Sequence, residues 1–188
     1  MDKFAHDRII IGMVLSLGLA HLLKGVARMI ERPSKPGIYP VHLLWVFYTF
    51  MLLIDFWWWE YRLGAAAKWY FASYLFVVFY ITCFYLLCSL LIPDDITEYP
   101  SYKEYYFSKG SRYFLLLAIV FLVDLGDTLI KGRTYFLSLG VEYPVRIASH
   151  FLLCLLAYRS KKEWVHVLLA ILFIVYGISW IVRVYGVQ

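Results

Sequence analysis

Side-chain amides are almost missing from this chain of 188 residues, because asparagine is absent and glutamine occurs only as Gln188. Charged residues make up only 16% of the sequence, whereas 63% is hydrophobic and 20% aromatic. This scarcity of charge excludes an ordinary soluble domain, which carries roughly 25% charged residues. We therefore expect an integral, multi-pass protein of a bacterial inner membrane or another cellular membrane, with the lipid bilayer as its first partner.

Several motifs of membrane and metal chemistry are also missing. The sequence has no HExxH motif, no Walker A motif, no Thr-Val-Gly-Tyr-Gly filter and no lysine on its last apolar segment for a retinal Schiff base. The three cysteines, Cys83, Cys88 and Cys154, lack the spacing of metal ligands, so we interpret them as small buried hydrophobic residues. We assign no cofactor and no metal, and we do not expect an enzyme, since no nucleophile has a neighbouring base.

What the sequence has in abundance is long apolar runs. Six of them reach the length of about 20 residues that a bilayer requires, at residues 8–30, 39–59, 69–92, 112–131, 135–158 and 164–185. The longest connection, 93–111, is too short for a separate domain. The sequence predicts an all-α, polytopic membrane helix bundle with six transmembrane helices in a single domain, 1–188. The net charge of +5 comes from basic residues scattered at span ends, where they meet lipid headgroups, so no nucleic acid is expected.

Aromatic residues gather at the predicted span ends. Trp57, Trp58, Trp59 and Trp69 are typical of an interfacial belt, and we predict that they are interface anchors, a platform for a stacked ligand being the alternative. The segment 101–113 mixes tyrosines with lysine and arginine, which predicts a short helix in the headgroup plane. The positive charges flanking the spans are too evenly divided to fix the orientation.

An internal duplication is suggested by two matching segments. Tyr-Pro-Val follows Gly37 in residues 39–41 and follows Gly140 in residues 143–145, with one residue inserted. The offset of the two glycines places His21, Lys24 and Arg28 over Asp124, Asp127 and Lys131. The sequence therefore predicts a 3+3 inverted repeat with halves at about 8–92 and 112–185, a plan that recurs in secondary transporters.

The two ionisable triplets each lie on one helical face and carry opposite signs at their centres. Because an isolated charge is costly inside a bilayer, we expect Lys24 or protonated His21 to pair with Asp124 or Asp127. The fifth span adds Arg146 and His150 on one face. The predicted ion or proton pathway, or coupling site, comprises His21, Lys24, Asp124, Asp127, Arg146 and His150. In it the carboxylates bind the cation, His21 relays protons, and Lys24 and Arg146 keep the carboxylates ionised.

The leading hypothesis is a small transporter or ion channel that moves protons, cations or a small charged solute, as a homo-oligomer because bulky aromatic residues leave little internal space. The alternative is a non-transporting membrane module that binds a lipid, quinone or partner protein and uses the same residues as static ion pairs. Haem or metal ligation by His21 and His150 is a weaker reading, since neither has a local companion ligand.

Overall fold

The regular structure is entirely helical in the described part of the chain. The computed structural model describes residues 3–31, 37–60 and 70–186. Its helices are α1 (Lys3–Glu31), α2 (Pro40–Trp59), α3 (Phe71–Leu91), α4 (Tyr102–Lys131), α5 (Arg133–Ser138), α6 (Glu142–Arg159) and α7 (Glu163–Tyr185). Five of them, α1, α2, α3, α4 and α7, are long and apolar enough to cross a membrane. The predicted all-α fold is confirmed, whereas six spans are not.

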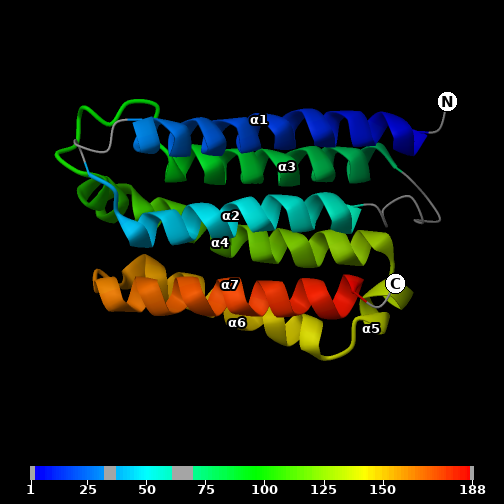
Figure 1. The fold of residues 1–188 in the computed structure, drawn as a ribbon. Coiled ribbons are helices and arrows are strands. Elements are labelled where there is room, and N and C mark those ends of the chain that lie inside the picture. The colour runs from blue at the N-terminus through cyan, green and yellow to red at the C-terminus, as the bar shows by residue number, and fades with distance from the viewer. Residues whose placement is uncertain (1–2, 32–36, 61–69, 187–188) are drawn as a thin grey trace.

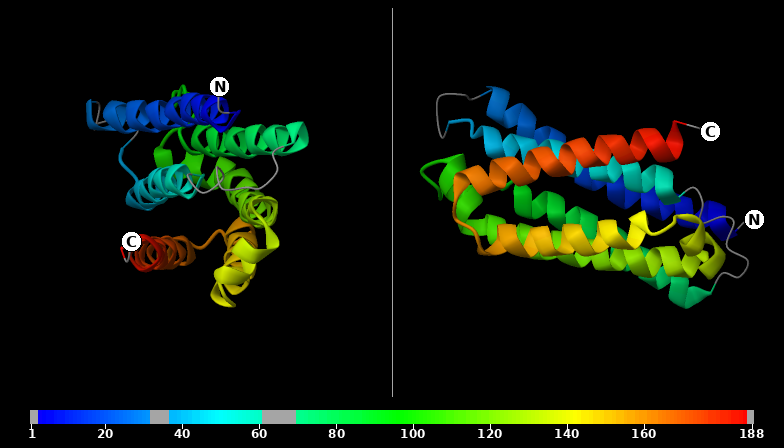
Figure 2. Two further views of the ribbon diagram at one scale, coloured as in Figure 1. Left: turned by 90° about the vertical axis from the view of Figure 1, so that its right-hand side faces the viewer. Right: turned by 90° about the horizontal axis from the view of Figure 1, so that it is seen from below.

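The six long helices run up and down in two layers of three (Figure 1). One layer holds α1, α2 and α7, and the other holds α3, α4 and α6, as the view along the bundle in Figure 2 makes clear. Helix α1 begins and α7 ends at the same end of the bundle, which we call the terminal end. The opposite end, where residues 92–101 connect α3 to α4, is called the loop end.

The predicted span 135–158 is interrupted near its start. Helix α5 ends at Ser138, and Gly140 takes the left-handed conformation, with φ of 68°, before α6 begins at Glu142. Glycine adopts this conformation without the steric cost that a Cβ atom brings. The continuous helix that remains has only 18 residues and includes Glu142, Arg146 and Arg159. It is therefore less apolar than the other five long helices.

The predicted headgroup-plane helix at 101–113 is wrong, because these residues form the first turns of α4. Ser101 caps the helix by accepting a hydrogen bond from the backbone N–H of Glu104, at 3.2 Å. With 30 residues, α4 is about 45 Å long, which exceeds the ~30 Å thickness of the hydrocarbon core. Its tyrosines Tyr102, Tyr105 and Tyr106 are buried against the neighbouring helices at the loop end.

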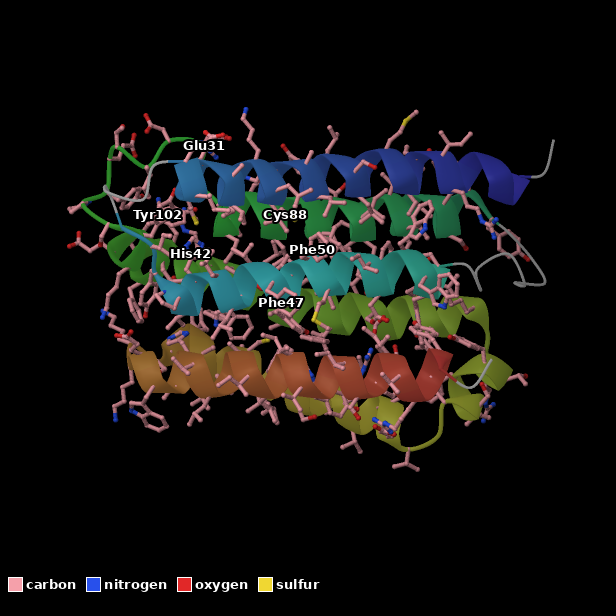
Figure 3. The ribbon with its side chains drawn as sticks, viewed as in Figure 1. Glu31, His42, Phe47, Phe50, Cys88 and Tyr102 are labelled. Carbon is pink, nitrogen blue, oxygen red and sulfur yellow. The ribbon has the colours of Figure 1, made fainter. Side chains whose placement is uncertain are left out.

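Large aromatic rings fill the middle of the bundle between the two layers. The ring of Trp45 makes edge-on contacts with those of Phe114, at 4.7 Å, and Phe173, at 5.4 Å. Tyr48 and Phe121 extend the same cluster, since each contacts Phe173. We call these five residues the aromatic plug. The predicted burial of the cysteines is confirmed, since Cys83, Cys88 and Cys154 are free thiols in the core; Cys88 is labelled in Figure 3.

The helix neighbours do not follow the two-fold symmetry of an inverted repeat. Helix α1 packs most closely on α3, whereas its predicted equivalent, α4, packs most closely on α6 and on α3. The strong contact between α2 and α7 has no comparable counterpart between α6 and α3 among the described residues. Only a local likeness supports the duplication: Gly37 and Gly140 are both left-handed, and each precedes a helix with proline in its first turn. The inverted repeat is not confirmed.

Candidate functional site

Asp124, on the inner face of α4, lies at the centre of a buried polar cluster. Its Oδ2 atom accepts hydrogen bonds from Arg146 NH2, at 3.1 Å, and from the Tyr143 hydroxyl, at 3.0 Å. Its Oδ1 atom accepts one from Tyr80 of α3, at 3.2 Å. The guanidinium group of Arg146 also lies 4.4 Å from the ring centre of Trp180 on α7. Three helices besides α4 therefore hold this ion pair in place.

About two turns closer to the terminal end, Lys131 joins two carboxylates from different parts of the chain. Its Nζ atom lies 2.5 Å from Oδ2 of Asp127 on the same helix and 2.8 Å from Oε1 of Glu60, directly after α2. All three side chains are at most 4% exposed. The ammonium group also lies 5.4 Å from the ring centre of Trp59. The spacing of four residues between Asp127 and Lys131 brings their side chains together on α4.

Two small cavities flank Arg146. One, of about 30 Å³, is lined by Asp55, Arg146, His150 and residues of α7, and the other, of about 20 Å³, by Asp55, Asp124, Arg146 and residues of α3. A polar cavity of roughly 10–15 Å³ can hold one water molecule. The Nε atom of Arg146 is buried and has no hydrogen-bond acceptor among the described residues. Each cavity thus has room for a water molecule beside a polar group that needs a partner.

The buried charges in this region do not balance. Four carboxyl groups, those of Asp55, Glu60, Asp124 and Asp127, face two cations, Lys131 and Arg146. If every group were ionised, the cluster would carry two excess negative charges. The neighbouring ion pair of Glu142 and Arg183, at 2.6 Å, contributes no net charge, because it joins one acid to one base.

The cluster lies toward the terminal end, not at the centre of the bundle. Lys131 is the last residue of α4, and Asp124 lies seven residues before it, which is about 10 Å along the helix axis. His150 follows one turn deeper on α6, where Nδ1 lies 2.8 Å from the carbonyl oxygen of Arg146. Its ring contacts those of Phe121 and Phe173 in the aromatic plug. The plug therefore separates the cluster from the loop end.

The predicted pairing of the first span with the fourth is wrong. His21 lies 2.8 Å from the carbonyl oxygen of Ile92, and Arg28 donates to the carbonyl oxygens of Pro93 and Asp94. These carbonyl groups follow the last turn of α3, where helical hydrogen bonds end and other donors are needed. Lys24 is exposed on α1 and has no ion pair among the described residues. His21 and Arg28 thus cap α3, while Asp124 and Asp127 have nearer cations.

The structure therefore brings together four of the six predicted site residues, namely Asp124, Asp127, Arg146 and His150. It adds Asp55, Glu60 and Lys131, together with the hydroxyl groups of Tyr80 and Tyr143. Lys131 could have been found from its spacing to Asp127. Glu60 has a weaker sequence signal, since it directly follows the run of tryptophans and resembles an ordinary acidic residue at a span end.

The tryptophans predicted as interface anchors differ in their surroundings. Trp57 and Trp58 are 47% and 56% exposed near the terminal end, as an interfacial position requires. Trp59 is only 4% exposed and packs against Tyr143 and Trp180 in the core. Trp69 lies outside the described residues.

Among the described residues, no three or more His, Cys, Asp or Glu side chains are grouped so that they could hold a metal ion. Comparison of the chain with protein-family models, with curated proteins and with solved structures gives no match. The arguments for function therefore come from the buried cluster itself.

Proposed function

We propose that this protein is an integral membrane protein that moves protons across the bilayer through the buried acidic cluster around Asp124 and Asp127. The observation that carries the proposal is the excess of four carboxyl groups over two cations. Ionised carboxylates are costly in a low-dielectric interior unless each has a partner. Protons are the smallest ligands that remove such an excess, and intramembrane carboxyl groups are common parts of proton relays.

Static ion pairing explains this cluster less well. Pairs that only fix helix positions need one cation for each carboxylate, as in the exposed pair of Glu142 and Arg183. In the buried cluster, Lys131 serves two carboxylates and Arg146 lies beside two more. An excess of acid groups is useful where protons bind and leave, but it costs stability where they do not.

The dimensions favour protons over a larger solute. The two cavities at Arg146 are sized for single water molecules, and the aromatic plug closes the way to the loop end. Passage through one copy thus requires the plug rings to move, whereas a solute would need a far larger opening. A homo-oligomer would offer a second route for protons, between the copies. Native mass measurement in detergent tests this route, and a spectrum of monomer alone would exclude it.

A sixth transmembrane helix is part of the proposal. Helix α6 would be about 27 Å long, and it packs along part of α4 (Figure 2). Its charged residues Glu142 and Arg146 are paired with Arg183 and Asp124, which lowers the cost of placing them in the membrane. The inverted repeat does not enter the proposal, because the helix neighbours differ between the halves.

Proton movement is tested with purified protein in liposomes that carry a pH-sensitive dye and an imposed pH gradient. We expect Asp124→Asn and Asp127→Asn to reduce proton flux at least about tenfold, since each replaces a carboxyl group by an amide that does not titrate in this range. Asp95→Asn in the exposed connection between α3 and α4 is the matched control and keeps the acceptor for Thr97. Unchanged flux in both folded α4 variants would refute the proposal.

A groove between α1 and α2 favours a second function, the binding of a lipid chain. It has a volume of about 230 Å³ and is lined by Gly12, Leu15, Ser16, Leu19, Leu53, Ile54 and Trp57. Its wall is mostly apolar, as an acyl chain requires. Gly12→Leu would fill the groove without touching the acidic cluster. Loss of copurified lipid without loss of proton flux would assign the groove to lipid binding and leave transport with the cluster.

A further inference from the structure

The carboxyl groups of Glu60 and Asp127 form a pair within the larger cluster. Both accept hydrogen bonds from Nζ of Lys131, at 2.8 Å and 2.5 Å, so one ammonium group holds the two carboxyl groups side by side. Their remaining oxygen atoms, Oε2 of Glu60 and Oδ1 of Asp127, are buried and accept no hydrogen bond from any described residue. Two carboxylates can only repel each other, but a carboxylic acid can donate to a carboxylate. One proton on either group therefore removes the repulsion between them and supplies an O–H donor beside the other carboxylate.

The net charge of Glu60, Asp127 and Lys131, which we call the trio, also indicates that one proton is bound. One ammonium group neutralises one carboxylate, so a single negative charge remains when all three groups are ionised. Because two carboxylates that share a site do not both ionise readily, one added proton gives a neutral trio. A second proton would leave the ammonium of Lys131 without a carboxylate and restore a buried net charge.

A cavity near the terminal end adjoins the trio at Glu60, and we call it the opening at Arg8. Its volume is about 120 Å³, and it is lined by Arg8 and Ile11 of α1 and by Trp57, Trp58 and Glu60. It has room for several water molecules. Glu60 lines this cavity, while Asp127 lies behind it toward Asp124. The order of the residues fits entry of a proton at Glu60.

We infer that Glu60 and Asp127 bind one exchangeable proton between them, beside the ammonium group of Lys131, and that water in the opening at Arg8 delivers and removes it. The proton comes from water and forms an O–H bond on one carboxylate, while Lys131 keeps its own proton. The role of this site in proton flux rests on the proposed function, but the binding of the proton does not.

Other titratable and charged groups face the pair from the surrounding helices. They are Arg8 of α1, Asp55 of α2, Tyr80 of α3, Asp124 and Lys131 of α4, and Tyr143 of α6. The two tyrosine hydroxyls bond to Asp124, and Arg146 also bonds to it. The positive charge of Arg8 favours release of the proton, whereas Asp124 favours its retention. These opposing neighbours make the proton exchangeable.

A hydrophobic carbodiimide tests the site, because it reacts with a protonated carboxyl group in an apolar setting. The O–H of the acid adds across a C=N bond of dicyclohexylcarbodiimide, and the adduct rearranges to a stable N-acylurea that peptide mass mapping locates. In the full chain we expect labelling of Glu60 or Asp127. The labelled fraction should fall about tenfold for each pH unit above the midpoint, as for any one-proton site. Asp94, 95% exposed, is the internal control and should stay unlabelled.

Single substitutions distinguish a shared proton from simple burial. In Glu60→Gln the remaining Asp127 has Lys131 to itself, and in Asp127→Asn the remaining Glu60 does, so each remaining carboxyl group should ionise and lose its label. Persistent labelling of the remaining group in either folded variant would overturn the inference. Protection of the unsubstituted protein by Na⁺ at constant pH would also overturn it and assign the site to a cation.

An infrared titration of the unsubstituted protein keeps the test independent of variant folding. The C=O stretch of one buried carboxylic acid should disappear as the pH rises, and a spectrum without that band at any pH would refute the site. Labelling of Glu60 without proton flux would uphold the site and refute the proposed function. Proton flux that depends on Asp124, without labelling at Glu60 or Asp127, would uphold the proposed function and refute the shared-proton site.

Discussion

The two arginines that pair with acids in the second half of the chain differ in their burial. The side chain of Arg146 is 12% exposed and bonds to Asp124, whereas that of Arg183 is 48% exposed and bonds to Glu142 through two nitrogen atoms. Removing one partner of a buried pair leaves an uncompensated charge, while an exposed pair contributes little. An arginine–carboxylate pair is therefore expected to matter for stability on α6, at Arg146, and to contribute little on α7, at Arg183.

A pair of glutamine substitutions measures this difference. Arg146→Gln should lower the free energy of unfolding in detergent by about 3–5 kcal/mol, because Asp124 loses its cation. Arg183→Gln is the matched control and should cost at most about 1 kcal/mol. Denaturant unfolding followed by tryptophan fluorescence gives both values. Equal losses in the two variants would mean that the pair of Arg146 and Asp124 is no more buried than the surface pair.

The site residues that the sequence predicted correctly are those whose partners lie close in the chain. Asp124 and Asp127 belong to α4 and Arg146 to α6, the next long helix, and helices close in sequence commonly pack together. Glu60 reaches Lys131 across 71 positions, and periodicity carries no information about that contact. His21 was misplaced because a basic residue has a second use: like Arg28, it caps the open end of a neighbouring helix, whereas Lys24 is simply exposed.

At the scale of helices, a close approach of α1 to the end of α3 depends on Gly25. A Cβ atom added there would lie 2.3 Å from Cγ2 of Ile92, well inside the normal contact distance of about 3.5 Å. Cγ2 is attached directly to the branched Cβ atom of Ile92, so it cannot move away without a rotation of the whole side chain. The same region holds the hydrogen bond between His21 and the carbonyl group of Ile92.

Gly25→Ala should therefore destabilise the bundle by about 1–3 kcal/mol, the usual cost of forcing an extra carbon atom into a packed interface. Gly110→Ala in α4 is the matched control. Its added Cβ atom meets only Phe114, at 3.9 Å, so the variant should gain up to about 1 kcal/mol from the higher helix propensity of alanine. Thermal unfolding in detergent compares the two. Ile92→Ala in the Gly25→Ala background should cost less than Ile92→Ala alone, and additive costs would contradict the predicted clash.

The helix boundaries were predictable where apolar runs are bounded by proline or glycine, as at Pro40, where α2 begins. They were not predictable where a run continues through a break. Residues 135–158 form an almost unbroken apolar pattern, yet Gly140 reverses the backbone and separates α5 from α6. In the same way, tyrosines at 102–106 resemble an interfacial segment in the sequence, but they are buried because α4 extends past the bilayer thickness and meets α2 and α7.

For the molecule as a whole, the number of crossings decides where its ends lie. Five helices satisfy the requirements of length and apolar composition, and α6 is the sixth long helix. An odd number of crossings would put the start of α1 and the end of α7 on opposite sides of the membrane, and an even number would put them on the same side. Both lie at the terminal end of the bundle (Figure 1).

We therefore predict that tags placed before α1 and after α7 are accessible from the same side. The experiment uses protease protection of sealed vesicles that carry the full chain with either tag, and both tags should be cleaved together or protected together. A third tag in the connection of residues 92–101, at the loop end, serves as the control and should show the opposite accessibility. The physical reason is that α6 comes between α4 and α7 in the chain order and runs opposite to both, as a sixth crossing requires (Figure 1). Its length of about 27 Å also nearly matches the ~30 Å hydrocarbon core. Opposite accessibility of the two terminal tags would show that α6 does not cross the membrane. The pair of Arg146 and Asp124 would then lie at the membrane surface.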